Sequence, residues 1–178
     1  MGRRLKLYYV NLKYVRNLHR VDSHVPSISP QEGKQNRPFL GVIVMVNNAK
    51  YCIPLSSKSA KKNKDFDSMR ENITLRKIRD NNGKVLAALN LNNMIPVRDE
   101  YITEIELKIR SVDSVSVKQW KKLCVKELDW CQINQAEIER LANELHHKYC
   151  SGESFHKRKI CLNFPALEKE CNKAKSFS

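Results

Sequence analysis

Two adjacent serines and a lysine, Ser56, Ser57 and Lys58, follow an apolar segment and open a lysine-rich loop. A hydroxyl can donate a hydrogen bond to a phosphate oxygen, and an ammonium group can offset charge that develops on phosphorus. RNA carries its own nucleophile, the ribose 2′-hydroxyl, so a protein that holds the backbone in line can promote cleavage without a metal ion. Ser57 and Lys58 are therefore candidate catalytic groups. The alternative role of the two serines is turn formation after a strand.

Other polar residues could join this site if the chain folds suitably. Tyr14 and Arg37 would do so if the first helix and the loop before the hairpin cover the same face. Further lysines could bind phosphate or could simply be solvated charges; these are Lys34, Lys61 and Lys62. The residues leave the general base and acid open, and four side chains are conceivable: Lys58, Tyr14, His19 and His24.

A β-hairpin must position the serines. Two apolar runs, 39–46 and 51–55, flank a polar break at 47–49, which is typical of a hairpin. Further strands are predicted over 5–10, 74–79, 84–91 and 94–97, and helices over 13–19, 116–132, 134–150 and 165–173. The segment 101–110 could be a strand or a helix, and its alternation of apolar residues favours the strand. Ser116 and Gln119 resemble a capping box, and Asn134 is the predicted cap of the next helix. The pattern predicts one α+β domain over 1–178, with a mostly antiparallel sheet wrapped by helices and a helical C-terminal third.

The charge is strongly asymmetric. The net charge is +14, and residues 1–64 hold 13 Lys and Arg against two acidic residues, a balance of +11. A polyanion partner is therefore expected, with most of its contacts in the N-terminal part. No apolar run is long enough to span a membrane, and no secretory signal is evident, so we expect a cytoplasmic protein with reduced cysteines.

Several common catalytic motifs are absent from the sequence. There is no P-loop, dinucleotide-binding glycine motif or acidic cluster for two metal ions. The spacing expected of metal ligands is matched only loosely by His146, His147 and Cys150, with His156 and Cys161 further along the chain. A simpler interpretation of this segment is the C-terminal end of a helix, where cationic side chains lie near the negative pole of the helix dipole. We therefore expect no metal and no cofactor.

The segment 51–58, YCIPLSSK, resembles the active-site segment of the ToxN/AbiQ family of type III toxin–antitoxin endoribonucleases, most closely the CptN-like branch. Other segments fit in the same order. These are LYYV at 7–10, the helix bearing Tyr14, NRPFLG at 36–41, LNLNNMIP at 89–96 and the helical C-terminal third. The resemblance covers about residues 5–172.

This resemblance implies a strongly twisted antiparallel sheet similar to the MazF/Kid toxins. It also implies sequence-specific, metal-independent RNA cleavage that leaves 2′,3′-cyclic phosphate and 5′-hydroxyl ends. The expected partner is a repetitive pseudoknot RNA antitoxin, which the toxin processes and which inhibits it in a closed ring, often of three toxins and three RNAs. Cellular or phage RNA would be the substrate, with a role in abortive infection.

Position by position, the resemblance assigns roles to particular residues. Ser57 matches the key hydroxyl and Ser56 the hydroxyl before it, whereas Tyr14 and Arg37 match residues that line the RNA groove. Phe39 would lie nearby and could stack on a base. Relatives usually have a proline between the second hydroxyl and the lysine, but Lys58 follows Ser57 directly. We expect Lys58 to be the catalytic lysine, with Lys61 or Lys62 as alternatives.

Two other functions remain open on the sequence alone. A non-catalytic RNA-binding protein would show the same charge asymmetry. A DNA-binding helix–turn–helix over 116–150 is the third interpretation, although Glu137, Glu139 and Glu144 would repel phosphate in a groove.

Overall fold

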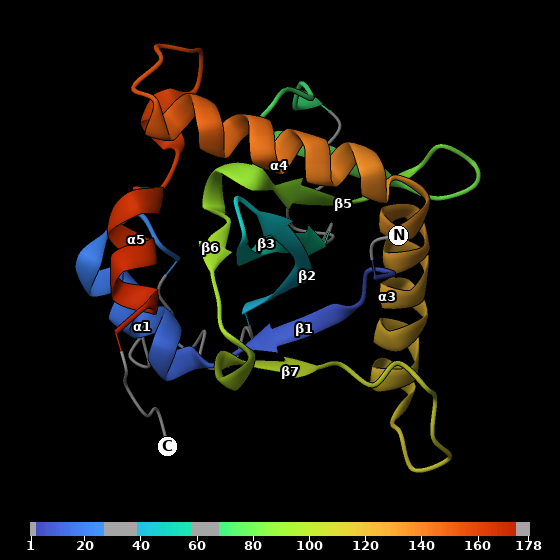
Figure 1. The fold of residues 1–178 in the computed structure, drawn as a ribbon. Coiled ribbons are helices and arrows are strands. Elements are labelled where there is room, and N and C mark those ends of the chain that lie inside the picture. Colours follow the sequence, from blue (N-terminus) through green and yellow to red (C-terminus); the bar gives the residue numbers. More distant parts are fainter. Residues whose placement is uncertain (1–2, 27–38, 58–67, 174–178) are drawn as a thin grey trace.

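The computed structural model describes residues 3–26, 39–57 and 68–173, and shows an antiparallel sheet surrounded by helices (Figure 1). The strands are β1 (Leu7–Val10), β2 (Phe39–Val46), β3 (Ala49–Ser57), β4 (Leu75–Arg79), β5 (Val85–Asn90), β6 (Ile95–Pro96) and β7 (Ile102–Glu104). The helices are α1 (Leu12–Val21), α3 (Val115–Ile133), α4 (Gln135–Cys150) and α5 (Phe164–Cys171), with short 3-10 helices at Leu91–Asn93, Asp99–Tyr101 and Arg158–Ile160. The strand order is β4-β5-β3-β2-β1-β7, and β6 pairs with β3.

The predicted hairpin is confirmed as β2 and β3. Val46 pairs with Ala49, so the connection is the two residues Asn47 and Asn48. Both have left-handed backbones, with φ of 48° and 65°. Two positive φ values in succession are what a type I′ turn requires, and asparagine tolerates them better than most residues. The turn fixes the register in which β3 pairs with β2, and β3 ends at the two serines.

β3 changes partners near its middle. Up to Pro54, which lies opposite Gly41, it pairs with β2, and from Leu55 to Ser57 it pairs with β5. Pro54 has no backbone N–H, so it cannot donate to a ladder at this crossing point. Gly41 allows the two backbones to approach closely, because a Cβ atom there would lie 2.0 Å from the Ile53 carbonyl oxygen. The end of β3 is thereby directed away from β2 and onto β5.

The helices enclose the sheet on several sides. α4 contacts β2, α5 contacts β6 and α1, and α3 contacts β4 and β5. Figure 1 shows α4 running across the sheet, with α3 roughly perpendicular to it at one end and α1 and α5 at the other. The strands and helices contribute to one core cluster, whose fully buried members include Tyr14, Tyr51, Ile53, Leu145 and Phe164. The predicted α+β class with a helical C-terminal third is confirmed.

Three local predictions differ from the structure. The strand expected over 101–110 ends at Glu104, because its partner β1 begins at Leu7 and offers nothing for 106–110 to pair with. α3 is capped by Ser114, whose hydroxyl accepts from the Val117 N–H, two residues before the predicted cap. Asn134 occupies the predicted N-cap position of α4, but its side chain donates to the Trp130 carbonyl of α3 and makes no capping hydrogen bond to α4.

All six cysteines are free thiols, and only Cys150 is exposed. Among the described residues, no helix is long and apolar enough to cross a membrane.

Candidate active site

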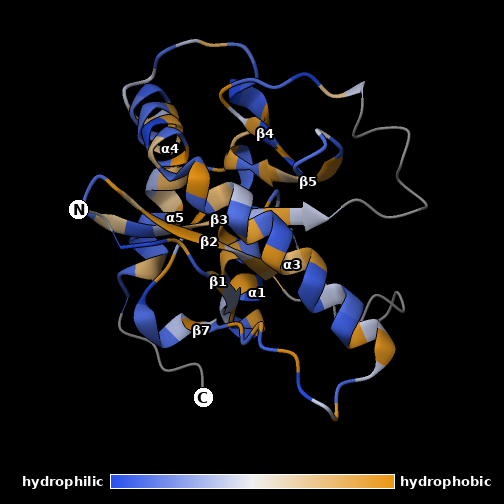
Figure 2. Cartoon of the chain, turned by 90° about the vertical axis from the view of Figure 1, so that its right-hand side faces the viewer, coloured by the Kyte–Doolittle hydropathy of each residue, from blue (hydrophilic) through white to orange (hydrophobic). Residues whose placement is uncertain are grey.

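Ser57 lies at the exposed end of β3, beside α3, which faces the viewer in Figure 2. Its Oγ donates a hydrogen bond of 2.8 Å to Oε1 of Glu127 on α3. The serine is exposed, but the glutamate is completely buried, with 0% of its surface accessible. The structure thus brings together an accessible hydroxyl and a carboxylate hidden behind it, from residues 70 positions apart.

Glu127 is buried because it lies on the inner stripe of α3. Cys124 and Cys131, three residues before it and four after it, lie on the same face and are buried. Its Oε2 atom has no hydrogen-bond partner within the described residues. This desolvation raises the pKa of the Glu127 carboxyl to about 7, while the hydrogen bond from Ser57 acts in the opposite direction. The carboxyl can therefore gain or lose a proton near neutral pH.

Ser56 points to the other face of the strand. Side chains alternate along a strand, so the two serines cannot share one set of partners. Ser56 Oγ accepts a hydrogen bond of 3.0 Å from the Asn90 side chain at the end of β5. The structure therefore gives the two candidate hydroxyls different surroundings.

An aromatic pair lies on the same face of α3 as Glu127. Trp120 stacks on Tyr9 of β1, with ring centroids 6.5 Å apart and planes inclined by 5°. Both side chains are half-buried, so part of each ring is accessible. Trp120 precedes Glu127 by seven residues, which is about 10 Å along a helix axis. Aromatic rings of this kind can stack on an unpaired base.

Phe39 lies at the same end of the sheet as the serines but is only 7% exposed. It begins β2, two residues before Gly41, which pairs with Pro54 of β3. Its side chain belongs to the core cluster, so this placement does not support stacking on a base. Five other predicted site residues lie outside the described residues: Lys34, Arg37, Lys58, Lys61 and Lys62.

Tyr14 is placed differently from the prediction that it lines the RNA groove. It is completely buried, its hydroxyl donates to the Pro96 carbonyl at 2.6 Å, and its ring stacks on Tyr101. Pro96 pairs with Tyr51, which is six residues and about 20 Å along β3 from Ser57. Burial also raises the pKa of the Tyr14 hydroxyl. Tyr14 therefore has a core-packing role in this structure and no access to RNA.

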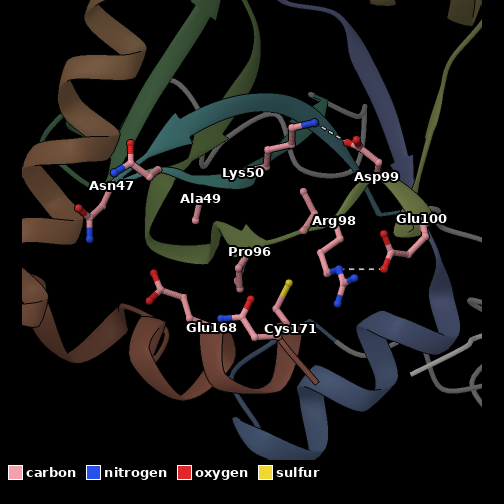
Figure 3. Close-up of a pocket in the computed structure, with 12 residues that line it drawn as sticks. Asn47, Ala49, Lys50, Pro96, Arg98, Asp99, Glu100, Glu168 and Cys171 are labelled. Carbon is pink, nitrogen blue, oxygen red and sulfur yellow. Dashed lines mark hydrogen bonds and ion pairs between the residues drawn. The ribbon is translucent and has the colours of Figure 1, made fainter. Parts of the chain in front are cut away.

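A polar pocket lies at the opposite end of β3, between the hairpin turn, β6 and α5 (Figure 3). Its basic side chains are paired with carboxylates, Lys50 with Asp99 and Arg98 with Glu100. Lys50 is seven residues from Ser57, or about 23 Å along the strand. This pocket is therefore separate from the serine site.

His146, one of the loosely spaced metal-ligand candidates, is engaged elsewhere. Its Nε2 lies 2.6 Å from Oε1 of Glu168, which also accepts from the Tyr51 hydroxyl at 2.5 Å. Within the described residues, no group of three or more His, Cys, Asp or Glu side chains is arranged to hold a metal ion.

Sequence reasoning missed Glu127, Tyr9 and Trp120 as site residues. The signal for Glu127 was present, because a charged residue interrupts the apolar stripe of Trp120, Cys124 and Cys131. A glutamate at such a position is buried, and a buried carboxyl needs a partner. The identity of that partner depends on the tertiary structure.

Comparison with known proteins identifies the family. The family model described as Toxin ToxN, type III toxin–antitoxin system, matches residues 6–172. The chain belongs to the ToxN family. It is 28% identical to Endoribonuclease ToxN of Bacillus thuringiensis subsp. kurstaki, over 96% of this chain and 84% of the relative.

Two solved structures share the ToxN fold. One is from work on selective toxin inhibition by a non-coding RNA pseudoknot in type III systems, with a TM-score of 0.73, 26% identity, and coverage of 95% of this chain and 96% of the other. The other is AbiQ, a lactococcal anti-phage endoribonuclease, with a TM-score of 0.77, 20% identity and the same coverage. The resemblance inferred from the sequence, the fold class and the enzyme class, endoribonuclease, are confirmed.

Proposed function

We propose that this ToxN-family endoribonuclease cleaves RNA at the exposed end of β3, without a divalent ion. Ser57 contacts the reacting ribose–phosphate, and Lys58 offsets the charge that develops on phosphorus. The 2′-hydroxyl attacks the neighbouring phosphodiester and leaves a 2′,3′-cyclic phosphate and a 5′-hydroxyl. The chain acts as one domain in the cytoplasm, and cleavage depends on the RNA sequence.

The observation that carries this proposal is the hydrogen bond between exposed Ser57 and buried Glu127. A hydroxyl held on an ionisable carboxyl whose pKa lies near 7 is suited to proton transfer at neutral pH. Lys58 is the next residue in the sequence after Ser57. The accessible Tyr9–Trp120 pair on the same side of the molecule offers a surface for base stacking.

The partner in this proposal is an RNA antitoxin built from pseudoknots. A structurally similar type III toxin is inhibited by a non-coding RNA pseudoknot, and the balance of +11 over residues 1–64 suits such a polyanion. A closed ring of toxin and RNA, with three copies of each, is the proposed assembly, and phage or cellular RNA is the proposed substrate. An antiviral role is consistent with the anti-phage activity of AbiQ.

The direct test is RNA cleavage by purified protein in EDTA, free of antitoxin RNA. Ser57→Ala and Lys58→Ala should each lower the cleavage rate by about 10²-fold or more, because each removes a group that acts on the reacting atoms. Ser151→Ala and Lys169→Ala, at exposed positions at the end of α4 and on α5, are matched controls and should cleave normally. A requirement for added magnesium would refute the mechanism, and full activity of both site variants would refute the site.

A further inference from the structure

The hydrogen bond between Ser57 and Glu127 restricts what Ser57 can offer to RNA. A hydroxyl has one proton and two lone pairs. When Glu127 is ionised it can only accept, so the Ser57 proton points inward along the 2.8 Å contact. Only lone pairs then remain on the exposed side of Ser57 Oγ. A phosphate oxygen, which is also an acceptor, cannot bond to them, whereas a ribose 2′-hydroxyl can.

We propose that Glu127 makes Ser57 the proton acceptor for the attacking 2′-hydroxyl. The 2′-hydroxyl transfers its proton to Ser57 Oγ while Ser57 passes its own proton to Glu127 Oε1. The bond between the 2′-oxygen and phosphorus forms, the bond from phosphorus to the 5′-oxygen breaks, and the 5′-oxygen takes a proton from water. Glu127 then returns its proton, through Ser57, to the hydroxide so formed, and the site is ready for another cycle. Glu127 acts through Ser57 and is therefore a positioning residue. This inference rests on the proposed function and deepens it.

The surroundings of Glu127 suit this role. Its neighbours on the inner face of α3 are the buried thiols of Cys124 and Cys131. Side chains alternate along a strand, so Arg76 on β4 lies on the same face of the sheet as Ser57. Arg76 forms ion pairs with Glu137 and Glu71. On β1, the pKa of the Tyr9 hydroxyl is raised by burial and, to a smaller extent, by the nearby Cys124 thiol. In the described part of the chain, no cation pairs with Glu127, and desolvation raises its pKa to about 7.

Ser56 provides a contrast on the neighbouring position of the strand. Its Oγ accepts from Asn90, so its own proton is not used in that bond. Ser56 can therefore donate to an acceptor such as a phosphate oxygen. In these hydrogen bonds the Ser57 hydroxyl is a donor and the Ser56 hydroxyl is an acceptor. The sequence Ser-Ser alone does not reveal this difference.

The experiment compares pH–rate profiles of kcat/KM, in EDTA, on one transcript that the wild-type protein cleaves. For wild type, the rate should rise about tenfold per pH unit below pH ~7 and level off above it, as expected for an essential base with the pKa of Glu127. Glu127→Gln keeps a carbonyl oxygen that can accept from Ser57 but cannot take a proton. It should lose about 10²- to 10⁴-fold in rate and lose the inflection near pH 7.

Two further variants keep the outcome interpretable. Glu127→Asp retains a carboxyl group and should retain the inflection at a lower rate. Asp129→Asn, at an exposed position on the same helix, is the matched control and should follow the wild-type profile. Melting curves and RNA-binding measurements on each variant establish that the fold and the affinity are retained.

The results separate this inference from the proposed function. A Glu127→Gln protein that cleaves at the wild-type rate, or that is slow but keeps the inflection, overturns the role of Glu127. If Glu127→Gln does not fold, absence of the inflection from a folded Glu127→Asp protein overturns it instead. A wild-type protein that does not cleave in EDTA overturns the proposed function itself.

Discussion

Replacing Glu127 by glutamine should stabilise the folded protein at neutral and alkaline pH while it removes activity. The carboxyl is completely buried, and its folded-state pKa is about 7 compared with an ordinary value of 4.5. An acid whose pKa is raised by folding binds its proton more tightly in the folded state than in the unfolded state. The contribution of Glu127 to stability should therefore be most favourable below pH 4.5, fall as the pH rises toward 7, and level off above that.

The size of the effect follows from the shift. Raising the pKa from 4.5 to about 7 corresponds to a loss of about 3 kcal/mol in the free energy of unfolding at pH 8, and of about 1 kcal/mol at pH 5. Glutamine is neutral at every pH, so Glu127→Gln avoids this loss. For a chain of 178 residues, the difference of about 2 kcal/mol between pH 5 and pH 8 corresponds to a relative rise in Tm of about 4–8 °C.

Thermal unfolding of both proteins, followed by circular dichroism between pH 5 and pH 8, measures this difference. The two Tm curves should diverge with increasing pH, and Asp129→Asn should run parallel to wild type. Curves for Glu127→Gln and wild type that stay parallel across the range would show that Glu127 keeps an ordinary pKa, and would refute the burial argument. Such an exchange of stability for activity is common at catalytic sites.

Two further substitutions test the positions that shape the site. Gly41→Ala should lower the free energy of unfolding by about 3 kcal/mol or more, because a Cβ there lies 2.0 Å from the Ile53 carbonyl oxygen. As a control, Gly83→Ala, where φ is positive but space is open, should lower it by only about 1 kcal/mol. Urea titration of both variants measures the two values. Tyr14→Phe should cost about 1–3 kcal/mol by leaving the buried Pro96 carbonyl without its donor, yet cleave RNA at the wild-type rate. A loss of cleavage above tenfold in folded Tyr14→Phe would show that Tyr14 does serve the active site.

Local patterns accounted for most of the fold. The alternation of apolar residues, the Asn47–Asn48 turn and the Asp80–Gly83 turn determined the strands, and helical periodicity determined α1, α3, α4 and α5, because these signals depend on neighbours in sequence. The strand predicted over 101–110 was mostly wrong because strand length is set by a partner, and β1 is too short to provide one.

For the candidate active site, the sequence determined which residue types follow the hairpin: two hydroxyls and a lysine at the end of a strand. It could not determine which hydroxyl meets which partner. The partner of each hydroxyl is determined by the tertiary structure, because the crossing at Gly41 and Pro54 turns the end of β3 onto β5 and brings Ser57 to α3. Burial of Glu127 and of Tyr14 was decided in the same way, since the exposure of a side chain depends on elements that are distant in sequence and adjacent only after folding.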